Sequence, residues 1–534
     1  MRLMSDNQQL ASHSSMWSPL RYSAFRAIWI AVTISNTGTW MHDMGVGWLM
    51  ATMTDSSFMV ALVQTATTLP FFLLALPAGT LADIVERRVF LLYTLTWMMM
   101  SAALLGILTL YGLTTPWILL GLTFSLGVGN AMMRPALSAS VPGLVPRAEL
   151  RKAITLNSMS LNVSRSAGPV LAGFVILSAG PAYVFLLNTL SFLVIMYAIY
   201  RWPVSAVDES VSLPVERFMG GMRAGLRYAQ NAPMLQAVLI KGLVFFFFSS
   251  AIWALLPVIA VKVLNGGPTL YGWLIAMIGI GAVVASQMMG WLNRKFSRNT
   301  IVTAGGLLYA ITLFGFGNST EIIILLVVLF FCGAAWLALF STIVVAGQLA
   351  VPDWVRARGL ALVMLTMMGS MSVGSALWGK LADQLGIPMT CTIAAIGLAL
   401  CLLLIRNVRI GEDDHIDLTP SMHWPTPEFA DDIRPDSGPV MVTVEYTVDN
   451  ANRAEFLRLS RQLKQLRKRD GAFFWEMYSR AGKANCLVEV FMVSSWLEHL
   501  RQHARVTVVD KQLQDKLRSL IVKETRPKRS HFIA

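Results

Sequence analysis

Long apolar segments separated by short polar loops make up the chain from residue 25 to residue 406. A helix of about 20 apolar residues is long enough to cross the hydrocarbon core of a bilayer. The chain is 55% hydrophobic and only 14% charged, so it has more apolar surface than a soluble core could bury. We therefore predict about twelve membrane-spanning helices, near residues 25–50, 57–80, 89–110, 116–136, 154–178, 182–201, 236–262, 270–292, 300–317, 322–347, 359–382 and 388–406.

The positive charges of the predicted loops alternate along the chain. Loops 52–57, 111–115, 179–182 and 317–320 contain no Lys or Arg, whereas the loops between them carry most of the basic residues that precede residue 409. Because Lys and Arg gather on the cytoplasmic side of a membrane, both termini are expected to be cytoplasmic, including an N-terminal segment at 1–23. This bias accounts for most of the formal charge of +13, so we expect membrane lipids and not nucleic acid as partners.

A short charged pattern occurs twice, in corresponding parts of two halves of the chain. A charged residue follows Gly by four positions and Arg follows by eight in both copies, which are Gly79, Asp83, Arg87 and Arg88, and then Gly290, Arg294 and Arg298. We expect Gly to let two helices meet closely and the charges to stabilise one conformation through ion pairs and helix ends. The repeat predicts two six-helix bundles, at 24–202 and 235–408, joined by a cytoplasmic loop at 203–234.

Several motifs of the first half resemble those of a known superfamily. The Gly79 to Arg88 pattern is similar to the loop motif of the major facilitator superfamily, with Val85 where that motif often has Gly. Other stretches resemble its transmembrane secretion effector type, which is related to enterobactin exporters and macrolide efflux pumps: Ser35-Asn36-Thr37-Gly38-Thr39-Trp40, Arg134-Pro135-Ala136, Val145-Pro146, Asn157, Arg165, Gly168-Pro169 and Gly173. This resemblance implies an all-α polytopic protein of the bacterial cytoplasmic (inner) membrane, with twelve transmembrane helices in two pseudo-symmetric bundles, that exports small molecules in exchange for protons.

Asp43 is a carboxylate deep inside a predicted span, beside His42. A charged group at such a depth is costly and usually has a partner or a function. Asp43 could gain and lose a proton as water or substrate enters, and so couple proton flow to transport. Alternatively, it lies at the wet outer end of the helix. His42 is a proton-relay candidate or a simple hydrogen-bonding residue, and the two neighbours cannot both face one cavity because they lie about 100° apart around the helix.

Two arginines also fall within or at the end of predicted spans. Arg165, a third proton-coupling candidate, lies near the middle of the fifth span, where it should face the cavity or form an ion pair, for example with Asp43. Gly168-Pro169 follows it and predicts close packing and a helix bend. Arg134 is expected to end the fourth helix, where it could gate the cavity or reach lipid phosphates. Trp40, Trp253 and Trp336 are candidate cavity-lining residues, since bulky apolar cargo needs an aromatic pocket.

The composition changes after residue 409. An acidic, proline-containing linker at 409–437 precedes a soluble segment at 438–534. Alternating apolar residues predict strands at 440–448, 472–479 and 486–493, with a helix at 450–469 and further helices from 495 to 521. This order predicts a cytoplasmic α+β ferredoxin-like domain. The segment resembles the tail of the secretion-effector carriers and antibiotic-biosynthesis monooxygenase-like modules, which implies a homodimer formed through this domain.

Two classes of function remain open from the residues alone. No Walker A pattern occurs, so a secondary transporter exporting a small hydrophobic or amphipathic molecule by alternating access is favoured over an ATP-driven pump. Import and lipid flipping are not excluded. The alternative is a membrane-tethered ligand-sensing or monooxygenase-like enzyme that uses the helices as an anchor. The four cysteines, Cys332, Cys391, Cys401 and Cys486, lack metal-ligand spacing, so neither a metal nor another cofactor is expected.

Overall fold

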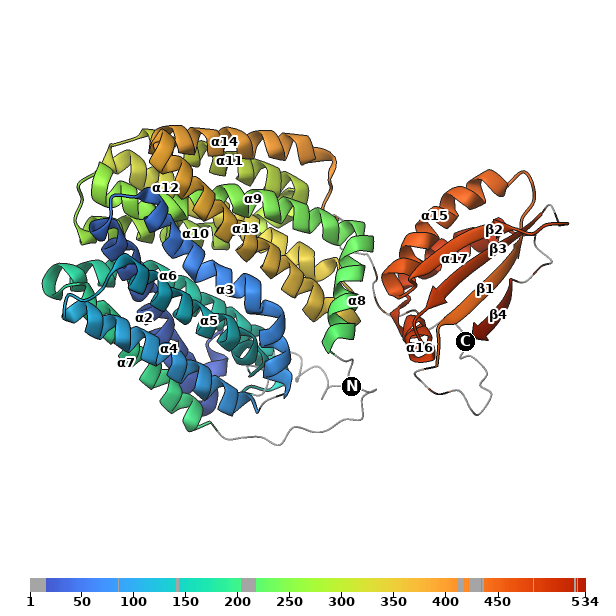
Figure 1. The fold of residues 1–534 in the computed structure, drawn as a ribbon, viewed down its shortest axis with the longest axis horizontal. Helices are drawn as coiled ribbons and strands as arrows, with labels where there is room; N and C mark the ends of the chain where they lie inside the picture. The colour runs from blue at the N-terminus through green and yellow to red at the C-terminus, as the bar shows by residue number, and fades with distance from the viewer. Residues whose placement is uncertain are drawn as a thin grey trace, which may run out of the picture. The chain divides into compact units, whose positions relative to one another are not determined.

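The computed structural model describes residues 16–84, 86–140, 144–202, 218–411, 417, 419, 421, 434, 437–483, 485–522, 525 and 527–534. Two sets of six long helices form its membrane part (Figure 1). The first set is α2 (Ser23–Met53), α3 (Ser57–Ile84), α4 (Arg87–Leu110), α5 (Pro116–Ser140), α6 (Leu150–Ala179) and α7 (Pro181–Tyr200). The second set is α9 (Pro233–Val258), α10 (Pro268–Lys295), α11 (Arg298–Asn318), α12 (Ile322–Leu349), α13 (Arg356–Leu385) and α14 (Ile387–Leu404).

The helices agree with the expected membrane fold. Within the described residues, eleven helices are long and apolar enough to cross a membrane. Helix α2, of 31 residues, is not among these eleven; it carries His42 and Asp43. The two bundles and the C-terminal sheet confirm the predicted fold class of an all-α membrane protein with a small α+β domain.

Short helical elements occur at corresponding places in the two bundles. In the first, η2 (Ser18–Arg21) precedes α2 and η4 (Arg147–Glu149) lies between α5 and α6; in the second, α8 (Phe218–Asn231) precedes α9 and η6 (Asp353–Val355) lies between α12 and α13. The remaining short elements are η5 (Ile259–Val263) and η7 (Ile405–Asn407). Gly180 and Gly386 have φ values of 98° and 79° at the matching turns before α7 and α14, a conformation that favours glycine. These matches support an internal duplication.

The C-terminal part contains one antiparallel sheet with helices packed on one face. Its strands are β1 (Val440–Thr447), β2 (Phe474–Ser479), β3 (Cys486–Val493) and β4 (Lys528–Ile533), in the order β2-β3-β1-β4. Its helices are α15 (Arg453–Asp470), α16 (Trp496–Arg505) and α17 (Val508–Ser519). Alternate residues of β1, from Val440 to Tyr446, are buried in the core with Phe456, Leu463 and Phe491. The topology is ferredoxin-like, and the sequence analysis missed only β4, whose residues are mostly exposed.

The chain divides into two compact units that do not follow the predicted boundaries. One unit comprises residues 1–212, 241–342 and 364–407, and therefore holds most of both bundles. The other comprises residues 213–240, 343–363 and 408–534. It thus joins the C-terminal domain to α8, the start of α9 and the turn between α12 and α13. Sequence could not predict this grouping because it depends on contacts between distant residues.

Candidate functional site

Asp43 lies where the two bundles meet. Its half-buried carboxylate interacts electrostatically with the Arg134 guanidinium of α5 and with the Tyr271 hydroxyl of α10. The Tyr271 hydroxyl also lies close to α2, since it would be 2.6 Å from a Cβ atom at Gly47. The acid of the first bundle is therefore linked to a cation of its own bundle and to a hydroxyl of the other.

Arg134 is not the last residue of its helix, and that prediction was wrong. Helix α5 continues through Pro135 to Ser140. The Arg134 side chain is exposed, and its guanidinium lies 5.7 Å from the centre of the Phe71 ring. Such a contact is typical of a cation–π interaction. Arg134, and not the Arg165 suggested by the sequence, is thus the arginine that interacts with Asp43.

His42 and Asp43 project about 100° apart around α2, as adjacent helix positions do. The imidazole is 2% exposed, and its ring centre lies 4.8 Å from that of Phe185 on α7. Neither ring nitrogen has a hydrogen-bond partner among the described residues. The geometry therefore places His42 in the packed interior of the first bundle.

Arg165 connects the first bundle to an aromatic cluster of the second. It is 7% exposed and donates a hydrogen bond of 3.0 Å to Asn162 Oδ1. Its guanidinium lies 5.3 Å from the centre of the Trp336 ring on α12. Trp336 stacks on Phe340 at 5.0 Å and contacts Trp253 at 6.1 Å between ring centres. Two of the three predicted cavity tryptophans, Trp253 and Trp336, are thus brought together beside Arg165.

The Gly168-Pro169 step lies at the crossing of three helices. A Cβ atom at Gly168 would lie 2.7 Å from the Cβ of Trp40, so glycine is needed for α6 to pack closely on α2. On the other side, the Pro169 carbonyl oxygen lies 2.5 Å from the place of a Cβ atom at Gly272 of α10. The step therefore lets α6 approach both bundles, and Trp40 packs in this crossing.

Charged contacts join the bundles at the end that carries the α2–α3 and α13–α14 turns. The Asp383 carboxylate of α13 accepts hydrogen bonds from Ser57 N at 2.5 Å and Ser56 Oγ at 2.6 Å. Lys262 donates to the Thr54 carbonyl at 2.5 Å and pairs with Asp55 at 2.9 Å. Acceptance of backbone N–H groups at the start of α3 favours the negative charge of Asp383. These contacts hold the bundles together at this end.

The sequence analysis missed Asp383, although a signal was present. Gly379-Lys380-Leu381-Ala382-Asp383 repeats the residues of Gly79 to Asp83 at all but one position. A Cβ atom at Gly379 would lie 3.1 Å from the Cα of Phe58, so a helix of each bundle meets closely here. The close helix approach that we expected at the charged pattern thus occurs at its third copy, Gly379 to Asp383. Lys241, near the start of α9, is another buried cation: it is 2% exposed and donates to Asn299 Oδ1 at 2.6 Å.

The two charged patterns that were predicted as loops are largely helical. Helix α3 extends to Ile84 and includes Gly79 and Asp83, whose side chains, like Val85 as a whole, lie outside the described residues. Arg87 begins α4 and is exposed, while Arg88 donates to the Tyr200 carbonyl at the end of α7 and lies 5.3 Å from the Tyr200 ring centre.

In the second copy, Gly290 and Arg294 lie within α10, and Arg298 begins α11. Among the described residues, no atom of another helix lies within 4 Å of the place of a Cβ atom at Gly290, so the expected close helix contact does not occur there. A pattern of Gly and charge marks helix ends, but it does not determine which of them are packed.

The C-terminal domain contains three close imidazoles. The ring of His499 lies 4.9 Å from that of His531 and 5.0 Å from that of His503, measured between ring centres. Burial, followed by the two neighbouring imidazoles, lowers the pKa of His499 to about 3, so this side chain stays neutral near pH 7. No group of three or more His, Cys, Asp or Glu among the described residues is arranged to hold a metal ion.

Comparison with known proteins identifies the family. The family model "Transmembrane secretion effector" matches residues 14–534, which includes both bundles and the C-terminal domain. The chain belongs to this transporter family of the major facilitator superfamily. The resemblance stated from the sequence motifs is therefore confirmed, and the chain is a membrane transporter and not an enzyme.

Several characterised relatives are similar over most of their length. The staphyloferrin A transporter of Staphylococcus aureus is 24% identical over 71% of this chain and 96% of its own. The enterobactin exporter EntS of Salmonella typhi is 25% identical over 75% of this chain and 95% of its own. The macrolide efflux protein A of Streptococcus pyogenes is 22% identical over 54% of this chain and 71% of its own.

Solved structures support the fold. The inward open xylose transporter XylE from E. coli superimposes with a TM-score of 0.56 at 13% identity, covering 73% of this chain and 98% of that one. A POT family transporter in complex with a thioalcohol conjugated peptide gives a TM-score of 0.58 at 13% identity, with 70% and 95% covered. At this identity the likeness concerns the fold alone.

Proposed function

We propose that this protein exports a small hydrophobic or amphipathic molecule across the bacterial cytoplasmic membrane in exchange for protons, by alternating access. The observation that carries the proposal is the position of Asp43, a half-buried carboxylate near Arg134 of its own bundle and Tyr271 of the other. The names of the relatives, which include a siderophore transporter, a siderophore exporter and a macrolide efflux protein, support a small-molecule cargo of this kind.

Asp43 would couple the proton to the movement of the bundles. While ionised, its carboxylate attracts the Arg134 guanidinium and accepts a hydrogen bond from any donor that approaches. A proton on Asp43 removes that attraction and frees Arg134. The link between the first bundle and Tyr271 weakens at the same time, because a neutral acid holds a neighbouring dipole less strongly. Proton binding and the opening of the bundle interface therefore become linked equilibria.

The aromatic cluster of the second bundle would receive the cargo. Trp253, Trp336 and Phe340 offer apolar rings, and Arg165 lies over Trp336. An apolar pocket with one cation suits an amphipathic molecule, since rings bury its apolar part and the guanidinium orients its polar part. Arg165 is therefore a cargo-positioning residue and Asp43 the proton acceptor.

The alternating loop charges favour a cytoplasmic position for both termini. The end held closed by Asp383 and Lys262 then faces outward, since its turns at 54–56 and 386 carry no Lys or Arg. In this orientation the structure represents a state closed to the outside. Outward release of cargo would require these charged contacts to break.

Self-association through the C-terminal domain is part of the proposal. The sheet face opposite the helices carries a row of apolar residues, one from each strand: Phe532, Met441, Met492 and Phe474. Phe532 is 52% exposed and Phe474 is 38% exposed. A second copy of this domain would cover the row. Light scattering of the purified full chain should give a dimer mass for the wild type and a monomer mass for Phe474→Ser/Phe532→Ser.

Transport in proteoliposomes tests the central claim. Vesicles loaded with wild type or Asp43→Asn receive a labelled macrolide or an iron-free catecholate siderophore under an imposed pH gradient. We expect the wild type to accumulate one of these probes against its gradient, and Asp43→Asn to lose accumulation while keeping downhill exchange. Asn keeps the size of the side chain but cannot bind or release the proton.

Glu321→Gln is the matched control because Glu321 is an exposed carboxylate outside the bundle interface. It should pump like the wild type. Normal accumulation by Asp43→Asn would show that protons are coupled elsewhere, and accumulation without any dependence on the pH gradient would overturn proton-driven export.

A further inference from the structure

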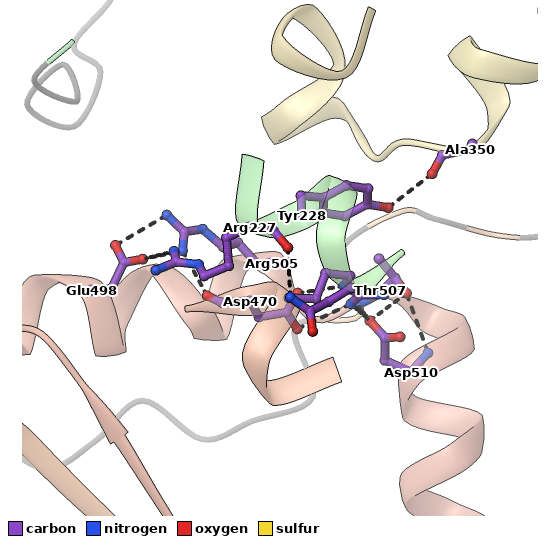
Figure 2. Close-up of polar contacts among 10 residues, drawn as sticks. Arg227, Tyr228, Ala350, Asp470, Glu498, Arg505, Thr507 and Asp510 are labelled. Atoms are coloured by element: carbon purple, nitrogen blue, oxygen red, sulfur yellow. Dashed lines mark hydrogen bonds and ion pairs between the residues drawn. The ribbon is translucent and has the colours of Figure 1, made fainter. Parts of the chain in front are cut away.

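The C-terminal domain contacts α8 and the turn between α12 and α13 within one compact unit (Figure 2). Arg227 of α8 donates to Glu498 of α16 at 2.8 Å and to the Gly471 carbonyl at 3.4 Å. Glu498 also accepts a hydrogen bond of 2.7 Å from Arg505. One carboxylate of the domain therefore binds an arginine of the membrane half and an arginine of its own helix.

Two cation–π contacts also join the C-terminal domain to α8 and to the turn between α12 and α13. The Arg505 guanidinium lies 4.5 Å from the ring centre of Trp354, in the η6 turn. The Arg469 guanidinium lies 5.6 Å from the ring centre of Tyr228, on α8. Tyr228 in turn donates to the Ala350 carbonyl at 3.0 Å, which joins α8 to the same turn. Three elements that are distant in sequence thus converge on a small set of rings and charges.

The cations of the domain are held in place by buried carboxylates. Arg469 pairs with Asp470 at 2.8 Å and with Asp510 at 2.6 Å. Asp510 also forms the capping box of α17 with Thr507. Arg469, Asp470, Arg505 and Asp510 are all 7% exposed or less. Because such networks are costly to desolvate and strongly position-dependent, the domain presents a preformed surface and not a flexible one.

Gly471 allows the close approach. Its φ of 139° lies in the region that favours glycine, and a Cβ atom there would lie 2.9 Å from Glu498 Oε1. Any side chain would therefore displace the carboxylate that binds Arg227.

The linker makes this contact intramolecular. Tethering raises the effective concentration of the domain at its docking site, so even a modest interface stays occupied. We propose that the surface formed by Arg469, Glu498 and Arg505 is a docking site in cis for α8 and the α12–α13 turn, and that docking makes these two elements of the second half move together.

The consequence for transport rests on the proposed function. In alternating access each bundle rocks as a nearly rigid body. Helix α8 leads directly into α9, and the η6 turn connects α12 to α13. A domain that binds both ties the start of one helix to the turn between two others. Release of the domain should therefore slow the transport cycle without abolishing it.

A double-mutant cycle on the full chain in nanodiscs tests the docking. The variants are Arg227→Ala, Glu498→Gln and their combination, and amide hydrogen exchange of residues 218–231 and 350–358 is the readout. We expect each single variant to raise exchange of these peptides by about tenfold, and the double variant to raise it little further, because residues that share one contact are not additive. Arg223→Ala, an exposed arginine on the same helix, should leave exchange unchanged.

Transport is measured separately on the same variants. A lower rate in both single variants, with the normal rate in Arg223→Ala, supports the role of docking in the cycle. Unchanged exchange in Arg227→Ala, or fully additive effects in the double variant, would overturn the docking site itself. Increased exchange together with an unchanged or faster transport rate would overturn only its role in transport.

Discussion

The two bundles differ in the side chains that they bring to their common interface. Helices α2 and α6 of the first carry hydroxyls, an acid and an arginine: Thr33 contacts Ser160 at 2.7 Å and Thr37 donates to Ser164 at 3.0 Å within this bundle, and Asp43 and Arg165 lie on the same two helices. The second contributes aromatic rings, including Phe246, Trp253, Trp336 and Phe340. Two halves built on the same plan have therefore acquired different chemistry.

This difference suggests a division of work. An acid near a cation on the polar side suits proton binding, whereas stacked rings on the other side suit apolar cargo. Arg165 is the point where the two surfaces meet, because it bonds to Asn162 of its own helix and lies over Trp336 of the other bundle. Variants on each side should therefore change different parameters of transport.

The largest effect is expected on the polar side. Arg134→Gln removes the cation that interacts with Asp43. We expect proton-driven accumulation to fall by about tenfold, which corresponds to about 1.4 kcal/mol of lost charge interaction. The pH dependence of transport should shift as well, because the cation favours the ionised acid. Arg201→Gln, an exposed arginine at the end of α7, is the control. An unchanged pH profile in Arg134→Gln would contradict the link to Asp43.

A smaller effect of a different kind is expected on the aromatic side. Trp336→Ala removes a ring that contacts Arg165, Trp253 and Phe340. The KM for the cargo should rise by about fivefold, in line with about 1 kcal/mol for the lost ring contacts, while the dependence on the proton gradient stays as in the wild type. Trp117→Ala serves for comparison, since Trp117 is 70% exposed. Loss of proton dependence in Trp336→Ala would contradict the proposal that the first bundle binds the proton and the second binds the cargo.

Loss of a contact that joins the bundles should change the populations of the open and closed conformations and leave proton binding unchanged. Asp383→Asn removes a negative charge from the N-terminal end of α3, at a cost of about 0.3–1 kcal/mol. We expect the closed end to open more often, seen as a broader distance distribution between spin labels at Leu113→Cys and Thr320→Cys. Glu321→Gln should not change the distribution. An identical distribution in Asp383→Asn would show that Asp383 does not hold this end closed.

The smallest effect concerns the matching turns of the two halves. Val145-Pro146 is followed by Arg147 and Ala148, whereas Val351-Pro352 is followed by Asp353 and Trp354. In the first half, Ser18 of η2 bonds to Glu149 at 2.5 Å; in the second, Tyr228 of α8 and Arg505 both contact Trp354. Trp354→Phe, which keeps a ring of weaker cation–π strength, should lower the free energy of unfolding by about 0.5 kcal/mol in chemical denaturation. If the stability of Trp354→Phe equals that of the wild type, Trp354 does not contribute to the docking site.

Much of the fold could be predicted because it depends on local pattern. Apolar segments long enough to span a bilayer predicted the helices, and alternating residues predicted three of the four strands. The fourth, from Lys528 to Ile533, was missed because an exposed edge strand carries little periodic signal. The boundary of α5 was missed because Pro135 is tolerated inside a helix within the membrane.

The site was only partly predictable, for a physical reason. The sequence identified Asp43 and Arg165 because they are charged residues within predicted spans. A charged group inside a membrane is costly, so such residues are rare. Their partners could not be deduced, because electrostatic interactions join residues that are far apart in the chain. Arg134 and Tyr271 were thus assigned to Asp43 only by the packing of α5 and α10 around α2.

The sequence alone determined that this protein spans a membrane, that it is duplicated and that a small α+β domain follows the helices, because each of these follows from periodicity, length and composition along the chain. The tertiary structure decided which copy of the Gly-and-Asp pattern is packed, which arginine meets which ring, and that the C-terminal domain forms one compact unit with α8 and the α12–α13 turn. These features depend on distances between remote residues, and only the folded chain fixes those distances.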